Sequence, residues 1–492
     1  LSACLNFLIF FLFTLVPCPE NLYNKNILVI QEEGNIVKTS MTQEEKFQMM
    51  TAAPIPGLIG RMAVPTIISM LITSFYNMAD TFFVARIGTS ATAAVGVVFP
   101  IMAVIQALGF FFGHGSGNSI SRRLGAKDAD TAGQLASLGF FSALLCGLCV
   151  TILGCLFLEP LALALGSTKT ILPYTKEYLG IILLGAPYMT AQLVLNNQLR
   201  FQGNAFYAMI GITSGGILNI FLDPLFIFTF NMGVSGAALA TIVSQFVSFL
   251  LLLMGHRISG CVPLKLKSLQ NPGKNLRIIA SGGLPSLFRQ GLGSLAILAL
   301  NWAANPYGDA AIAAMSIVSR ISQFASSSLI GFGQGFQPVC GFNYGAKRYD
   351  RVMEAFWFCV KVATCVLFVI AVLGFCFASP LISLFRKDDL QVISIGAKAL
   401  RLQCIALPLT GWVIMNNMMT QTIGKTFRAS LLAAARQGIF FIPAILVLPG
   451  LAGILGIQLA QPIADLCAFL LAVILNRSVI KEMKIQEKEL SQ

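Results

Sequence analysis

The sequence predicts an all-α integral membrane protein, with twelve transmembrane helices in two six-helix lobes that repeat in parallel. Its 492 residues are 56% hydrophobic and only 11% charged, with a mean hydropathy of +0.79, whereas soluble domains carry about 25% charged residues. From Ile55 onward, apolar runs long enough to cross a bilayer alternate with short polar segments. Lipid offers no partners to backbone polar groups, so runs of this length must be helical.

The apolar runs also divide the chain into two lobes. We expect an N-terminal tail at 1–54, a first lobe at 55–256, a cytoplasmic linker at 257–276, a second lobe at 277–476 and a cytoplasmic tail at 477–492. The linker is basic and contains the turn-forming run Asn271-Pro272-Gly273. The twelve predicted spans are 59–84, 91–119, 133–158, 175–198, 206–229, 233–255, 277–302, 310–337, 352–377, 391–417, 427–448 and 453–475.

Glycines, prolines and polar residues recur at an offset of 220 residues. Glycine and proline recur because helix kinks and close helix contacts are requirements of the backbone. The offset covers six spans, so both halves enter the membrane in the same direction, which is one of the repeat architectures of transporters. The matched pairs include Pro65 with Pro285, Gly88 with Gly308, Gly125-Ala126-Lys127 with Gly345-Ala346-Lys347, and Asn196-Asn197 with Asn416-Asn417.

The distribution of Lys and Arg predicts the orientation. The net charge is +13, and most of the cations fall in loops after even-numbered spans and in the C-terminal tail. Loops after odd-numbered spans hold only Arg86, Lys169, Lys176, Arg386 and Lys387. The positive-inside rule therefore predicts a multi-pass protein of the cell (plasma or inner) membrane, with the lipid bilayer as a partner and both termini in the cytoplasm.

Residues 1–40 differ from the rest of the chain. Their apolar run from Leu5 to Val16 is shorter than the roughly 20 residues that a span requires. It also lacks the basic region of a signal peptide. Met41, which opens MTQEEKFQMM, is a more natural start. We expect residues 1–40 to be a translation artefact or a disordered tail.

Several functional classes are disfavoured by composition. No aromatic-plus-basic stripe indicates nucleic-acid binding, and two histidines, His114 and His256, do not make a metal centre or a compact catalytic cluster. Cys146 and Cys149 lack a second pair, so a redox or zinc role is disfavoured. The glycine-rich run at 109–117 follows no strand, so it indicates close helix packing rather than a phosphate loop. We therefore expect neither an enzyme nor a bound cofactor.

Three carboxylates fall inside predicted spans: Asp80, Asp223 and Asp465. A charge at the bilayer centre costs at least ~2.5–3.5 kcal/mol unless it is compensated. One interpretation is an ion or proton site, and the other is a structural hydrogen-bond partner. We favour the first for Asp80 and Asp223. Asp465 shows no obvious partner in the sequence, and both interpretations stay open for it.

The depths of Asp80 and Asp223 are similar. At 1.5 Å per residue, Asp80 lies ~28 Å up its span and Asp223 ~25 Å up its own. Asn219 shares the helix face of Asp223, and Thr241 returns to a comparable depth. These oxygen atoms are hard ligands that suit a small cation. Alternatively the two acids bind a proton, because desolvation and a neighbouring like charge both favour the neutral form.

The second lobe carries intramembrane cations instead, of which some are expected to snorkel. Arg289 is the deepest and either neutralises an acid or contacts substrate. We expect Tyr76, Asn77 and the paired Asn196, Asn197, Asn416 and Asn417 to belong to a central cleft. The remaining cations are Arg320, Lys361, Lys398, Arg401 and Arg436.

Four segments carry a family resemblance: FYNMADTFFVARIGT, LNIFLDPLFIF, GVSGAALAT and the YGAK loop. With the 6+6 repeat, they resemble the multidrug and toxic compound extrusion (MATE) family, and within it the MepA-type bacterial exporters, over roughly residues 41–480. The resemblance implies export of organic cations and drugs by alternating access, in antiport with H⁺ or Na⁺. It also implies a cation-coupling site at Asp80, Asn219, Asp223 and Thr241.

One feature departs from the Na⁺-coupled branch of the family, which uses acids in spans 7 and 8. This chain has none there, which argues against coupling through the second lobe. A flippase of lipid-linked saccharides is the main alternative, but it would need a more cationic cleft and usually extra spans. A passive channel is disfavoured by the two-lobed repeat. We expect a monomer, and the choice between H⁺ and Na⁺ stays open.

Overall fold

The computed structural model describes residues 41–266, 271–386 and 389–491, and every regular element in these ranges is helical. The expectation about residues 1–40 lies outside the described residues. The first half comprises α2 (Gln43–Ala52), α3 (Ile55–Ala85), α4 (Thr89–Gly125), α5 (Ala129–Leu156), α6 (Leu158–Ala164), α7 (Leu172–Phe201), α8 (Ala205–Pro224), η2 (Leu225–Thr229) and α9 (Gly233–Ile258).

The second half repeats this order. It comprises α10 (Pro272–Ala304), η4 (Asn305–Tyr307), α11 (Asp309–Gly345), α12 (Tyr349–Cys376), α13 (Ala378–Ser383), α14 (Leu390–Thr422), α15 (Thr426–Ala434), η5 (Ala435–Phe440), α16 (Phe441–Ala452) and α17 (Ile454–Ser491). The predicted linker is shorter than expected, because α10 begins at Pro272. The predicted C-terminal tail is helical, because α17 continues to Ser491.

Ten of these helical segments are long and apolar enough to cross a membrane. α10 and α11 are also long, at 33 and 37 residues, but they carry more polar residues, including the Ser326-Ser327-Ser328 run of α11. They can be more polar because one face of each packs against the other lobe instead of lipid. Together these twelve segments confirm the predicted multi-pass architecture.

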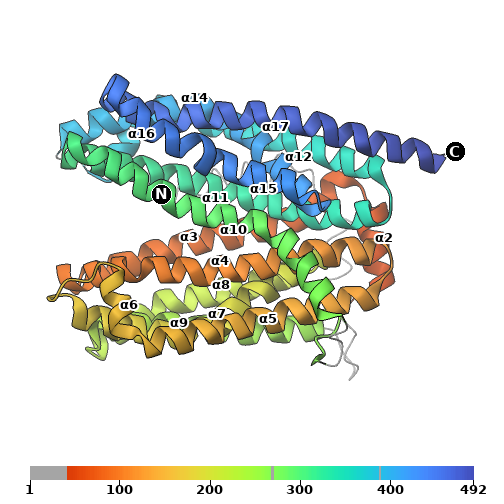
Figure 1. Cartoon of the computed structure of the whole chain (residues 1–492), viewed down its shortest axis with the longest axis horizontal. Coiled ribbons are helices and arrows are strands. Elements are labelled where there is room, and N and C mark those ends of the chain that lie inside the picture. The colour runs from red at the N-terminus through yellow and green to blue at the C-terminus, as the bar shows by residue number, and fades with distance from the viewer. Residues whose placement is uncertain (1–40, 267–270, 387–388, 492) are drawn as a thin grey trace, which may run out of the picture.

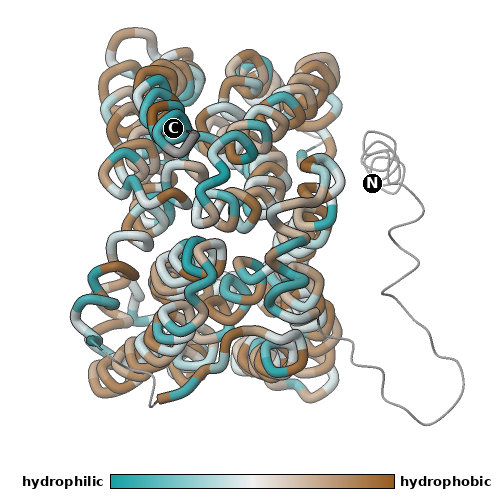
Figure 2. Tube along the Cα trace, turned by 90° about the vertical axis from the view of Figure 1, so that its right-hand side faces the viewer, coloured by the Kyte–Doolittle hydropathy of each residue, from teal (hydrophilic) through white to brown (hydrophobic). Residues whose placement is uncertain are grey.

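The helices form two groups that lie one above the other in Figures 1 and 2. The first lobe contains α3 to α9 and the second contains α10 to α17. Across the middle, α3 and α4 of the first lobe face α10 and α11 of the second (Figure 1). Figure 2 shows hydrophobic residues spread over the outer sides of both groups, as expected for surfaces in contact with lipid.

The repeat extends to the backbone conformation. Lys127 and Lys347 are 220 positions apart and both adopt left-handed conformations, with φ of 58° and 60°. Few non-glycine residues do so. The matched loops therefore end α4 and α11 in the same way, and the parallel repeat read from the sequence is a repeat of structure.

Glycines set how closely the lobes approach. A Cβ on Gly115 would collide with the backbone of Ile279 in α10, and a Cβ on its repeat partner Gly335 would collide with Ala63 in α3. The glycine-rich run of α4 therefore packs one lobe against the other, as small residues do at membrane helix interfaces.

Helix α2 joins the two lobes, although it lies in the stretch expected to be a tail. Lys46 donates from Nζ to the carbonyl of Ser259 at 2.6 Å, which anchors α2 to the first lobe. At the C-terminal end of α2, Arg348 donates to the carbonyl of Thr51 at 2.8 Å, and Arg351 donates to the carbonyl of Ala53. Two cations of the second lobe thus meet the carbonyl end of the helix, where positive charge is favoured.

Candidate functional site

The two ends of the bundle differ. The basic end holds the loops at 126–128, 202–204, 346–348 and 423–425, together with α2. The far end holds the loops at 86–88, 230–232 and 305–308. Helices α3 and α8 both run from the basic end to the far end, so residues at equal steps along them stay side by side.

The packing of α3 on α8 brings the predicted site residues together. A Cβ on Gly216 would lie 3.0 Å from Cδ1 of Tyr76, so the Tyr76 ring fills the space that this glycine leaves on α8. One helical turn further along α3 is Asp80, and the next turns of α8 hold Asn219 and Asp223. The Tyr76 side chain also bonds to Gln245 of α9, which ties all three helices together.

The site itself is enclosed. Asp223 is 0% exposed and Asn219 2%, and Asn219 donates from Nδ2 to Oδ1 of Asp223 at 3.2 Å. Thr241 is buried on α9 and donates its hydroxyl to the carbonyl of Ala237 at 3.1 Å. Asp80 lies close enough to interact electrostatically with Asp223. The structure therefore groups the four residues that the sequence singled out.

Three acceptor oxygens at this site have no hydrogen-bond donor among the residues that the structure describes: Oδ1 of Asp80, Oδ1 of Asn219 and Oδ2 of Asp223. Leaving a buried acceptor unpaired costs about 1–3 kcal/mol, and more for a charged group. A proton or a small hard cation would satisfy these oxygens and relieve the repulsion between the carboxylates. Across the described ranges, no three His, Cys, Asp or Glu side chains gather to hold a metal ion.

Tyr178 is a member of this site that the sequence analysis missed. Its side chain is fully buried in α7, where it interacts with Asp80, Asp223 and Thr241. A tyrosine near the end of a predicted span is typical of the membrane interface. Nothing in the sequence distinguishes Tyr178 from such an anchor.

The lobes meet along the facing sides of α3 and α11. Near the basic end the lobes touch: Thr66 of α3 donates to the carbonyl of Gly331 at 2.6 Å. Further along the same faces, Phe75 meets Phe324 with ring centroids 5.8 Å apart. Met78, three residues further along α3, is 49% exposed. Arg320, one helical turn before Phe324 in α11, is also exposed.

Asn77 is also exposed on α3, next to Met78. The paired asparagines divide into two kinds. Asn197 accepts a hydrogen bond from Arg200, and Asn417 accepts one from Arg289 at 3.5 Å, so this matched pair meets the central arginines. Asn196 instead donates to the carbonyl of Ala208, and Asn416 donates to that of Ala472. The second matched pair therefore holds neighbouring helices together within each lobe.

Asp465 has a partner that the sequence did not reveal. Its Oδ1 accepts from Nε of Arg436 at 2.7 Å and from Nε2 of Gln461 at 2.9 Å. The side chain of Asp465 is 1% exposed and that of Arg436 is 18% exposed. The expectation that Asp465 lacked an obvious partner was wrong, because Arg436 lies 29 residues earlier in the chain and reaches it from the π-helical turn η5.

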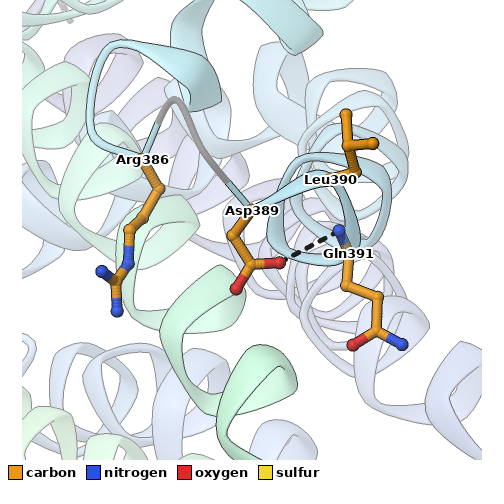
Figure 3. A pocket seen from close by; sticks show the side chains of 4 residues that line it. All are labelled: Arg386, Asp389, Leu390 and Gln391. Carbon is orange, nitrogen blue, oxygen red and sulfur yellow. Dashed lines mark hydrogen bonds between the residues drawn. The ribbon is translucent and has the colours of Figure 1, made fainter.

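The pocket in Figure 3 is separate from this site. It lies at the far end of the second lobe and is lined by Arg386, Asp389, Leu390 and Gln391. The Asp389 carboxylate already accepts from the backbone amides of Gln391 and Val392, both at 3.1 Å. It caps the N-terminus of α14, which is a structural task.

The sequence matches the MatE family profile at residues 65–225 and 285–447. The chain belongs to the MatE family. The two matched segments begin 220 residues apart, so each corresponds to one copy of the repeat. Membership makes the protein a multi-pass membrane transporter and not an enzyme.

Relatives and solved structures agree with this assignment. The multidrug export protein MepA of Staphylococcus saprophyticus is 28% identical over 92% of this chain and 99% of its own length. A crystal structure of MATE in complex with MaL6 has a TM-score of 0.84 and 28% identity, over 89% of this chain and 99% of that one. The outward-facing conformation of a multidrug resistance MATE transporter of the MOP superfamily has a TM-score of 0.84 and 27% identity, over 89% and 98%.

Proposed function

We propose that this MatE protein is a secondary active multidrug exporter that moves amphiphilic organic cations out of the cell in antiport with H⁺ or Na⁺. The multidrug export activity named for its MepA relatives supports the substrate class. The structure adds a reason for coupling to reside in the first lobe. Its buried acids, Asp80 and Asp223, make no ion pair in the described residues.

One observation carries the coupling proposal. Three buried oxygens of Asp80, Asn219 and Asp223 converge without donors, and Thr241 and Tyr178 complete the shell. Such a site is high in free energy when empty and low when a cation fills it. A ligand shifts a conformational equilibrium only when it binds one state better than another. We propose that the cation binds the state with the far end open.

The proposed cycle places the basic end in the cytoplasm, in accordance with the positive-inside rule. The structure, closed at the basic end, would then face outward. An external cation reaches Asp80 and Asp223 and favours bending of α3 at Pro65, which lies inside that helix. Bending narrows the cleft and expels the drug. When the basic end opens, a new drug enters from the cytoplasm. We propose that the protein works as a monomer of the cell membrane.

The test is ethidium transport in everted vesicles with a pH gradient or a Na⁺ gradient imposed separately. We expect one gradient to drive transport in the wild-type protein. Asp80→Asn and Asp223→Asn should reduce gradient-driven transport to the level of vesicles without the protein, because neither amide can bind the cation as a carboxylate does. Expression should be unchanged. Wild-type transport by both variants would overturn the assignment of these two acids.

A further inference from the structure

Within the described part of the chain, two arginines close to the boundary between the lobes have no acidic partner. Arg200 at the end of α7 is 1% exposed, and Arg289 in the middle of α10 is half-buried. The ion pairs among the described residues involve other cations, and neither arginine takes part in one. Burying an unpaired charge is costly, so a buried arginine of this kind indicates a functional role.

Arg200 is held by neutral groups only. It donates to Oδ1 of Asn197 and, across the lobe boundary, to Oε1 of Gln334. Its third contact is with Nε2 of His114 at 3.4 Å, while Nδ1 of the same ring lies 3.2 Å from the carbonyl of Phe110. A neutral ring protonated at Nδ1 satisfies both contacts. Nε of Arg200 has no partner.

Arg289 lies close enough to interact with both Arg200 and His114. Its hydrogen bond to Oδ1 of Asn417 is long, at 3.5 Å. Further toward the far end, Arg320 is exposed on α11, one helical turn before Phe324, which meets Phe75 of the first lobe. The region where the lobes face each other therefore carries positive charge.

The four helices at which the lobes face each other, α3, α4, α10 and α11, are here called the cleft helices. They carry no acid that balances this charge. α4 and α10 contain no Asp or Glu, and in α11 the single acid is Asp309, at the far end. Asp80 of α3 belongs to the coupling site. Opening of the basic end must also break the cross-lobe bond from Arg200 to Gln334, which would leave a guanidinium facing the cleft without its best partner.

We propose that the cleft recognises an anionic group on the transported molecule, with Arg289 and Arg200 as its ligands. Guanidinium groups bind carboxylates and other oxyanions through paired, charge-assisted hydrogen bonds. The preferred substrates are then amphiphilic cations that also carry a carboxylate, in other words zwitterions. This inference rests on the proposed export function and narrows its substrate class.

Two dyes that differ in the presence of a free carboxylate test whether the protein recognises an anionic group. Rhodamine 6G is a cationic ester, and rhodamine 19 differs from it in having the free carboxylate. We expect the purified wild-type protein in detergent to bind rhodamine 19 at least as tightly as rhodamine 6G, as measured by fluorescence polarisation. Arg289→Gln should raise the Kd for rhodamine 19 by about tenfold or more and leave the Kd for rhodamine 6G within about twofold. Arg289→Lys should recover most of the rhodamine 19 affinity.

Arg401→Gln is the matched control. It removes one positive charge from the same lobe, at a side chain that lies over the Phe375 ring away from the cleft helices, and should leave both Kd values unchanged. Weaker wild-type binding of rhodamine 19 than of rhodamine 6G would overturn the inference. So would equal losses for both dyes in Arg289→Gln, because a structural defect does not discriminate between them. Binding does not depend on a gradient, so failure of the export proposal would appear separately, in the vesicle experiment.

Discussion

The two lobes repeat the same helices but differ in whether their buried acids are paired with a cation. Alignment at the offset of 220 residues matches Gly216 with Arg436 and Gln245 with Asp465. In the first lobe, Gly216 leaves room for the Tyr76 ring, and Tyr76 bonds to Gln245. In the second lobe, the matching positions form the buried ion pair between Arg436 and Asp465.

From this difference we infer which lobe responds to a cation. In the first lobe, Asp80 and Asp223 have oxygens without donors, so a cation gains new interactions by binding there. In the second lobe, a guanidinium that belongs to the protein already occupies the equivalent region. We infer that the first lobe is the coupled one and that the Arg436–Asp465 pair keeps the second lobe fixed.

The largest expected effect on stability comes from breaking the second-lobe pair. Arg436→Gln leaves Asp465 buried without its cation, which should lower the free energy of unfolding by about 3–5 kcal/mol. The thermal unfolding of the purified protein measures this. The double variant Arg436→Met/Asp465→Leu removes both charges and should recover much of the loss.

Replacing a buried acid of the first lobe should affect stability much less than breaking the ion pair of the second lobe. Asp223→Asn should change the unfolding temperature far less than Arg436→Gln does, because it removes an unpaired charge and breaks no ion pair. Arg436→Gln should in turn retain gradient-driven transport per folded molecule. If Arg436→Gln abolished transport while the protein stayed folded, the inferred division between the lobes would be wrong.

A smaller effect tests whether the lobes separate as units at the basic end. Arg351→Ala removes the bond from the second lobe to the carbonyl of Ala53, which should weaken the closed state by about 1.5–3 kcal/mol. Distances between spin labels on the two lobes near the basic end should shift toward longer values. Arg477→Ala, which changes a cation of α17 outside this contact, is the control. An unchanged distance distribution in Arg351→Ala would show that α2 does not hold the lobes together.

The smallest effect concerns the acid at the far end of the second lobe. Asp389→Ala removes the cap of α14 and should cost about 1 kcal/mol of stability. Transport should not change, because this carboxylate is engaged by backbone amides. A change in the gradient dependence of transport would show instead that the pocket of Figure 3 takes part in coupling.

The fold and most of the candidate site could be predicted from the sequence. Apolar run lengths fix the spans, and acids such as Asp80 and Asp223 stand out because charge is rare there. The partner of Asp465 could not be predicted, because η5 sets the direction in which Arg436 points. Tyr178 was missed because the burial of a side chain in a membrane protein depends on the neighbouring helices. The polarity of the residue alone does not reveal whether it is buried. Helix α2 was missed because it is polar and packs only where both lobes meet.

The most direct test of coupling is cation release from the purified protein. If the site at Asp80 and Asp223 couples transport, drug binding should release a bound cation, seen as a proton with an indicator dye or as displaced radioactive Na⁺. We expect stoichiometric release from the wild-type protein and none from Asp223→Asn at saturating drug. Equal release from both proteins would contradict it, because the cation would then bind elsewhere.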